Sequence, residues 1–170
     1  MALRRSMRTK MSESLRVCIA VEATTAEIYH AISRLFPRVK SFWQGLALSE
    51  ENHTKILLEA SRLYSAGILN EDIVPTSLPH VYETFALVRD SKKKVEAATL
   101  SLKNAFDMAL EIENSTGESY FQEVISQETN SEVVSKLRDL LIDEELHKNK
   151  IQKVMNSMGF YNESHGSDTS

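Results

Sequence analysis

Along four segments of the chain, apolar residues recur at alternating steps of three and four, the spacing that keeps side chains on one face of a helix. The chain of 170 residues has only five glycines and three prolines, too few for the many turns of a β-sandwich or barrel. Its length suits one domain with a sizeable core. The sequence therefore predicts a single all-α domain.

Proline, glycine and capping residues set the expected limits of the first two helices. Pro37 cannot continue the hydrogen-bond ladder of a helix, so the first helix is predicted at about 13–36. Ser41 with Gln44 three residues later forms a capping-box pattern, and Gly67 is a natural C-terminal stop. These signals place the second helix at about 42–66.

The second half of the chain predicts two more helices after a long connection. Pro75 and Pro79 make residues 67–90 too irregular for one long helix, with room for a short one at about 82–88. Ser91 opens a helix expected to reach about 127, and Thr129 begins a capping box ahead of a helix over about 129–159. We therefore expect two helical hairpins joined by a long crossover, which carries the chain back along the bundle.

Residues 1–12 are expected to be a flexible basic N-terminal arm, residues 13–159 the bundle, and residues 160–170 a disordered polar tail. The net charge of −4, with basic residues interspersed among acids, disfavours nucleic acid as a partner. No run approaches the roughly 20 apolar residues of a membrane span. With Cys18 as the single cysteine and no signal-peptide pattern, a cytoplasmic location is expected.

Each of the four apolar stripes is interrupted midway by an acidic residue, and two of them also by a histidine. The interrupting residues are Glu22, Glu50, His53, Glu113, Glu144 and His147. Burying unpaired carboxylates is costly, and four of them close together repel one another. Because four carboxylates carry −4 and imidazole binds metals as a neutral ligand, two divalent cations would neutralise the cluster. The pattern predicts a two-metal site.

The two halves of the chain repeat this pattern. The segment Glu22-x-x-Thr25-x-Glu27-x-Tyr29 matches Glu113-x-x-Thr116-x-Glu118-x-Tyr120, and Glu50-Glu51-x-His53 matches Glu144-Glu145-x-His147. An internal pseudo-twofold axis follows, with one Glu-x-x-His unit on each metal. Tyr29 and Tyr120 lie nearly on the ligand face, where each hydroxyl could reach a carboxylate across the bundle. The sequence leaves open which carboxylates bridge the two metals.

These motifs resemble the diiron domain of the rubrerythrins, within the ferritin-like superfamily, over roughly residues 13–158. The resemblance implies a ferritin-like four-helix bundle that binds two iron ions and forms a homodimer. It also implies an oxidoreductase whose di-ferrous centre is oxidised by hydrogen peroxide or dioxygen, in defence against oxidative stress.

The chain departs from rubrerythrins at two points. Thr116 stands where they carry an additional glutamate, and no CxxC pairs of a rubredoxin domain are present, so a separate electron donor is expected. Two alternatives stay open. One is a ferroxidase of ferritin type that oxidises iron and passes it on or stores it. The other is a structural or interaction bundle whose site is empty or holds zinc or manganese.

Overall fold

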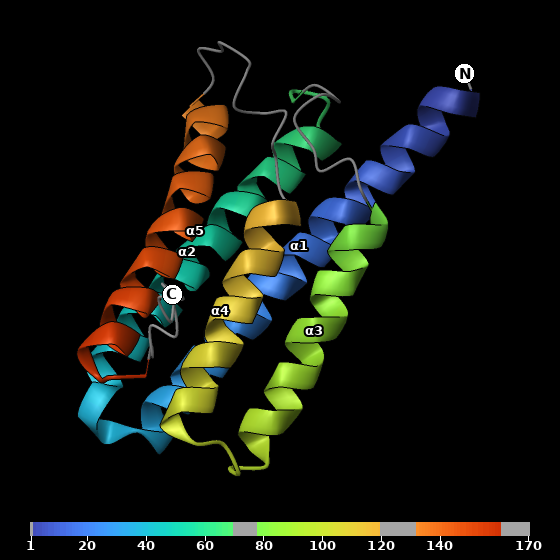
Figure 1. Cartoon of the computed structure of the whole chain (residues 1–170). Helices are drawn as coiled ribbons and strands as arrows, with labels where there is room; N and C mark the ends of the chain where they lie inside the picture. The colour runs from blue at the N-terminus through green and yellow to red at the C-terminus, as the bar shows by residue number, and fades with distance from the viewer. Residues whose placement is uncertain (1, 70–77, 120–131, 161–170) are drawn as a thin grey trace, which may run out of the picture.

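The computed structural model describes residues 2–69, 78–119 and 132–160, which form a bundle of five α-helices (Figure 1). The helices are α1 (Ala2–Leu35), α2 (Lys40–Ser65), α3 (Leu78–Glu96), α4 (Leu102–Ser119) and α5 (Glu132–Ser157), with a short 3₁₀ turn at Pro37–Val39. Over these ranges there is no strand, which confirms the all-α prediction. None of the described helices has an apolar stretch long enough to span a bilayer.

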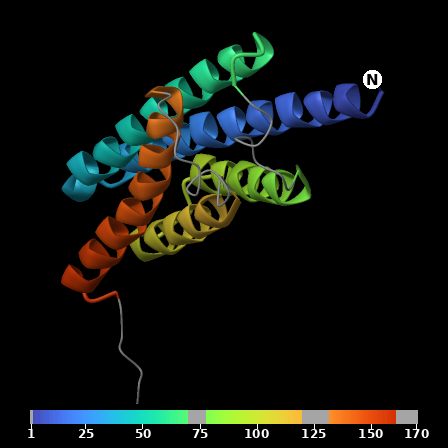
Figure 2. The same cartoon turned by 90° about the horizontal axis from the view of Figure 1, so that it is seen from above.

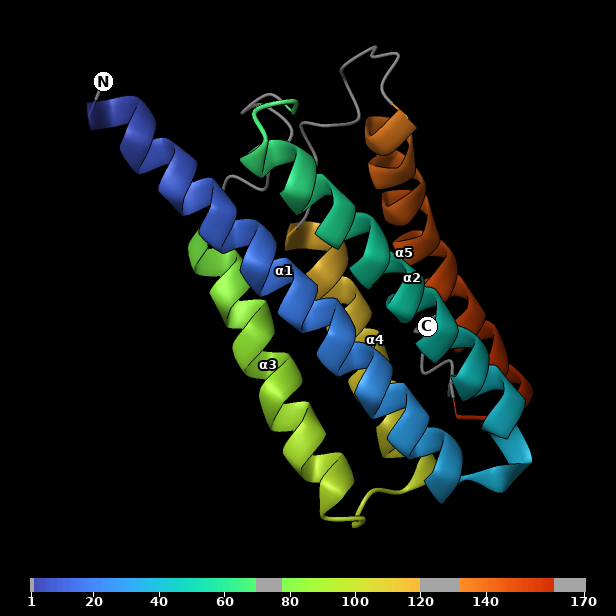
Figure 3. The same ribbon diagram turned by 180° about the vertical axis from the view of Figure 1, so that it is seen from behind.

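Consecutive helices run in opposite directions along the bundle (Figures 1 and 3). The helix α1 packs on α2, and α5 packs on both α4 and α2. The fifth helix, α3, packs on α1 and α4 and returns the chain along the length of the bundle, as the view from above also shows (Figure 2). Four helices, α1, α2, α4 and α5, thus surround the interior in which the predicted site residues lie.

The helix α3 corrects the expectation of an irregular connection over residues 67–90. It begins at Leu78, with Pro79 in its first turn, where the missing backbone N–H of proline costs no hydrogen bond. Its buried residues recur at steps of three and four, the spacing of a helix face, although Pro75 and Pro79 indicated an irregular segment. These residues are Val81, Thr84, Val88, Ser91 and Val95. Residues 70–77 of the expected crossover lie outside the described residues.

The single helix expected over 91–127 is also wrong, because α3 ends at Glu96 and α4 begins at Leu102. Ala98 adopts a left-handed backbone with φ of 53°, which no helix accommodates. The Ser101 side-chain oxygen then accepts a hydrogen bond from the backbone N–H of Asn104 at 3.1 Å, capping the new helix. Residues 120–131 of the expected helix lie outside the described part of the chain.

The start of α1 differs from the predicted boundary by several turns, whereas the end of α2 lies close to its predicted boundary. The helix α1 begins at Ala2, so residues 2–12 extend it where a flexible arm was expected, and Figure 3 shows these turns projecting beyond α3. Those residues include neither glycine nor proline and are rich in good helix formers. Gly67, with φ of 75°, follows α2 and donates its N–H to the Tyr64 carbonyl, as its stop signal predicted.

Aromatic side chains pack tightly in the core near the turn between α1 and α2. Trp43 and Phe106 are completely buried, with ring centroids 4.7 Å apart. Phe42 and Tyr29 contact the Trp43 indole with centroids at 5.2 and 5.6 Å. This cluster fills the core on one side of the predicted site and excludes water there.

Candidate metal centre

The structure brings all six predicted ligands together in the middle of the bundle. The side chains are Glu22 on α1, Glu50 and His53 on α2, Glu113 on α4, and Glu144 and His147 on α5, each 2% exposed or less. They form two adjacent clusters whose candidate ligand atoms lie within 4.8 Å of one another. One cluster is Glu22, Glu50, His53 and Glu144, and the other is Glu50, Glu113 and His147. Such an arrangement is consistent with a two-metal site.

Helical periodicity explains this convergence. The residues one turn or two turns away on the same helix faces are buried and apolar, and include Cys18, Leu46, Leu57, Ala109, Leu140 and Ile151. Because these side chains direct one face of each helix into the core, the intervening acids and histidines are carried into it as well. The site therefore lies in a dry, apolar shell.

Both imidazoles present Nδ1 to the carboxylates. His53 Nδ1 lies 3.0 Å from Glu50 Oε2, 3.3 Å from a Glu144 oxygen and 3.6 Å from a Glu22 oxygen. The two rings are stacked, with centroids 5.5 Å apart and planes inclined by 25°. This geometry makes Nδ1 the nitrogen of His53 that is available to a cation among the carboxylates.

His147 repeats the arrangement in the other half of the site. Its Nδ1 lies 2.9 Å from Glu50 Oε1 and 3.4 Å from Glu113 Oε2. The two oxygens of Glu50 therefore face the two histidines, one each. Of the four glutamates, only Glu50 belongs to both clusters.

Among the described residues, the hydroxyl groups of two residues outside the predicted ligand set donate hydrogen bonds to its carboxylates. Tyr29 donates to Glu113 Oε1 at 2.5 Å across the bundle, and Thr116 donates to Glu144 Oε2 at 2.8 Å. The contact of Tyr29 has the geometry expected from its spacing, whereas Tyr120 lies outside the described residues. Sequence reasoning missed Thr116 as a donor, although its place in the repeat opposite Thr25 was a signal that could have revealed it.

Burial and mutual repulsion strongly perturb the acids of the site. Burial, with the nearby carboxylates of Glu50 and Glu144, raises the pKa of Glu113 to about 8. Burial, reinforced by Glu144, also raises the pKa of Glu22 well above its usual value. For Glu50, burial acts in the same direction, but the adjacent imidazoles of His147 and His53 outweigh it and hold its pKa well below the usual range.

The histidines respond in the opposite direction to their burial. Desolvation lowers the pKa of an imidazole, yet the carboxylates of Glu113 and Glu50 raise the pKa of His147 to about 10. Glu144, Glu22 and Glu50 together raise the pKa of His53 even further. The cluster therefore retains protons at neutral pH whenever no other cation compensates its carboxylates.

Unpaired atoms show that cations fit the site. Buried polar atoms without a hydrogen-bond partner include one oxygen of each of the four glutamates, Nε2 of His53 and both ring nitrogens of His147. His147 Nδ1 and Glu50 Oε1 lie 2.9 Å apart but are not aligned for a hydrogen bond. Buried polar groups in native proteins nearly always have a hydrogen-bond partner. This many unpaired carboxylate oxygens and imidazole nitrogens in the same side-chain clusters is therefore what a set of metal ligands would show when no metal is bound.

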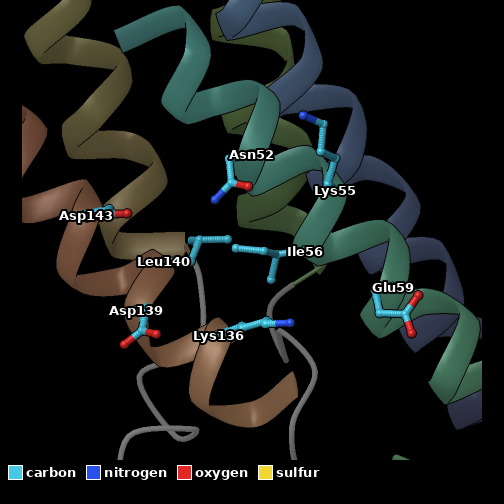
Figure 4. Close-up of a pocket in the computed structure, with 8 residues that line it drawn as sticks. All are labelled: Asn52, Lys55, Ile56, Glu59, Lys136, Asp139, Leu140 and Asp143. Atoms are coloured by element: carbon cyan, nitrogen blue, oxygen red, sulfur yellow. The ribbon is translucent and has the colours of Figure 1, made fainter. Parts of the chain in front are cut away.

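A hollow lies between α2 and α5, lined by residues of both helices (Figure 4). It has a volume of about 320 Å³, and its lining includes Asn52, Ile56, Glu59, Lys136, Asp139 and Asp143. Asp143 Oδ2 lies 3.6 Å from His53 Nε2, and its side chain is 43% exposed. Asp143 thus connects the wall of the hollow with a histidine of the site.

Comparison of the chain with known protein families, with curated proteins and with solved structures gave no match.

Proposed function

We propose that the protein is a diiron oxidoreductase of the ferritin-like superfamily, similar to rubrerythrin, that is oxidised by hydrogen peroxide or dioxygen. The observation that carries this proposal is the buried set of four glutamates and two histidines, each of which has at least one side-chain oxygen or nitrogen without a hydrogen-bond partner among the described residues. Oxygen and imidazole nitrogen donors in these numbers suit divalent iron. The contacts of α1 with α2 and of α4 with α5, with α3 returning the chain between them, support the superfamily assignment.

Two ferrous ions held by these residues would supply two electrons together, the number that reduces hydrogen peroxide to two molecules of water. The protein's own part is to hold the ligands in place and to keep the surrounding volume dry. Tyr29 fixes the orientation of the Glu113 carboxylate through their hydrogen bond. A small oxidant would approach the site from the hollow, at the side where Asp143 lies 3.6 Å from His53. A separate protein or small molecule would return the electrons.

The test is anaerobic reconstitution of the full chain with ferrous iron, followed by elemental analysis and optical spectroscopy. We expect two ions per chain and rapid oxidation on addition of peroxide or, separately, of air, with turnover when an electron donor is added. Glu113→Ala and His147→Ala should each abolish binding of two ions, because each removes a buried ligand.

The matched control is Glu111→Ala, an exposed glutamate on the same helix as Glu113, which should leave binding unchanged. If both ligand variants keep two ions per chain, the ligand assignment is wrong. If two ions bind but neither oxidant reacts with the reduced protein, the site is structural or holds another metal.

The half-exposed carboxylate of Asp143 beside the site favours a second candidate function, a ferroxidase that oxidises iron and passes it on or stores it. The Asp143 carboxylate, 3.6 Å from His53 Nε2, would attract a ferrous ion toward this histidine, while Lys55 and Lys136 balance Glu59 and Asp139 in the rest of the lining. This function predicts sustained oxidation of iron(II) added in excess of two ions per chain. A peroxidase or oxidase would instead stop after one oxidation of its bound iron unless an electron donor is supplied.

A further inference from the structure

The two halves of the candidate site are related by the internal repeat, yet among the described residues their equivalent threonines differ in hydrogen bonding. Thr25 and Thr116 occupy equivalent positions, three residues after Glu22 and Glu113 respectively, and both are buried. Within the described part of the chain, the Thr25 hydroxyl has no hydrogen-bond partner. The Thr116 hydroxyl lies 2.8 Å from Glu144 Oε2, closer than to either backbone carbonyl within its reach.

The two glutamates of the Glu-x-x-His motifs, Glu50 and Glu144, also differ in their contacts. Glu50 has both oxygens directed at histidines, at 2.9 Å from His147 and 3.0 Å from His53. Glu144 directs one oxygen at His53, 3.3 Å away, while its second oxygen accepts the bond from Thr116. The equivalent residues of the repeat are therefore not equivalent as ligands.

We propose that the two metal positions are unequal, because Thr116 restricts Glu144 to the position beside His53 and leaves Glu50 as the carboxylate shared by both. The position beside His53 then has four protein ligands, Glu22, Glu50, His53 and Glu144. The position beside His147 has three, Glu50, Glu113 and His147. This inference rests on the proposed metal-binding function and deepens it.

The two positions then differ in affinity and in access. The position beside His53 has one more carboxylate, so it binds a divalent cation first and more tightly. The position beside His147 has fewer protein ligands, so it binds the second ion more weakly and keeps room for an exogenous ligand such as water or an oxidant. Thr116 is a positioning residue in this arrangement, since it acts through Glu144.

Titration calorimetry of the full metal-free chain with Zn²⁺ alone tests the proposal without redox chemistry. The wild type should bind two ions in two resolved steps. Thr116→Val keeps the side-chain volume but frees the second oxygen of Glu144, so the ratio of the two dissociation constants should shrink by about 10- to 100-fold. Thr116→Ser retains a hydroxyl and should keep both steps separate. Thr25→Val is the matched control and should leave both constants unchanged, since its hydroxyl has no partner.

Each outcome is informative. If Zn²⁺ fails to bind at two ions per chain, the proposed metal site falls and this inference falls with it. If the wild type binds two ions with equal affinity, the metal site stands but the inequality is refuted. If the two steps are resolved in the wild type and unchanged in Thr116→Val, the role of Thr116 is refuted. Retention of two resolved steps by Thr116→Ser shows that an effect of Thr116→Val comes from the lost hydroxyl and not from misfolding.

Discussion

Binding of two divalent ions should release about four protons from the site, because four protons balance the same carboxylates in the metal-free protein. The groups that hold them are those whose pKa values are raised in the folded protein, namely Glu22, Glu113, His53 and His147. With two protons displaced per ion, the affinity for each ion should rise about 100-fold when the pH is raised from 6 to 7. This corresponds to about 2.7 kcal/mol per ion.

Calorimetric titration with Zn²⁺ at one pH, in buffers that differ in ionisation enthalpy, counts the released protons directly. His147→Ala should abolish binding of the second ion, and with it the protons that this ion displaces, so the count should fall by about two. His80→Ala is the control, since His80 lies at the surface beside Glu83 and away from the site. A total release below about two protons would refute the charge balance on which the two-metal interpretation depends.

Tyr29→Phe leaves a buried oxygen of Glu113 unpaired and should lower the free energy of unfolding of the metal-free protein, measured with denaturant, by about 1–3 kcal/mol. The control Tyr82→Phe, at an exposed tyrosine, should change this free energy little. An equal loss of stability in both variants would contradict the role of Tyr29. The pKa of Glu113 rises from 4.5 in the unfolded chain to about 8 when folded, so its stabilising protonation is lost as pH rises. The melting temperature of the metal-free protein should therefore fall between pH 5 and pH 8, and a rise would refute this sign. Asp143→Asn removes a charge at the hollow and should slow Zn²⁺ uptake in stopped-flow experiments without changing the number of ions bound. The control Glu111→Gln should leave the rate of uptake unchanged. If Asp143→Asn takes up Zn²⁺ as fast as the wild type, the hollow is excluded as the route.

The burial of the six site residues could be predicted because helical periodicity places each of them on the apolar face of its own helix. Glu51 illustrates the strength of this argument, since it follows Glu50 directly but is displaced by about 100° around the helix. In the structure it pairs with His30 at 2.8 Å, and its side chain is 43% exposed. A one-residue step in the chain thus separates a buried candidate ligand from a surface charge.

Features that depend on contacts between helices could not be predicted in the same way. The helix α3 forms because its apolar stripe packs on α1 and α4, and Pro79 lies in the first turn, where proline does not oppose a helix. The break before α4 depends on the left-handed Ala98, which has no glycine signal. The bond from Thr116 to Glu144 joins α4 to α5 and requires particular rotamers on both helices, which residue spacing does not determine.

The position of Trp43 makes the intrinsic fluorescence of the protein sensitive to metal binding in the core. Trp43 is the only tryptophan of the chain, and its indole contacts Tyr29, whose hydroxyl is bonded to Glu113. It precedes Glu50 by two helical turns, a rise of about 10 Å. Emission from this one fluorophore should therefore be quenched when iron occupies the bundle, so that loading and loss of the ions can be followed in the unlabelled protein.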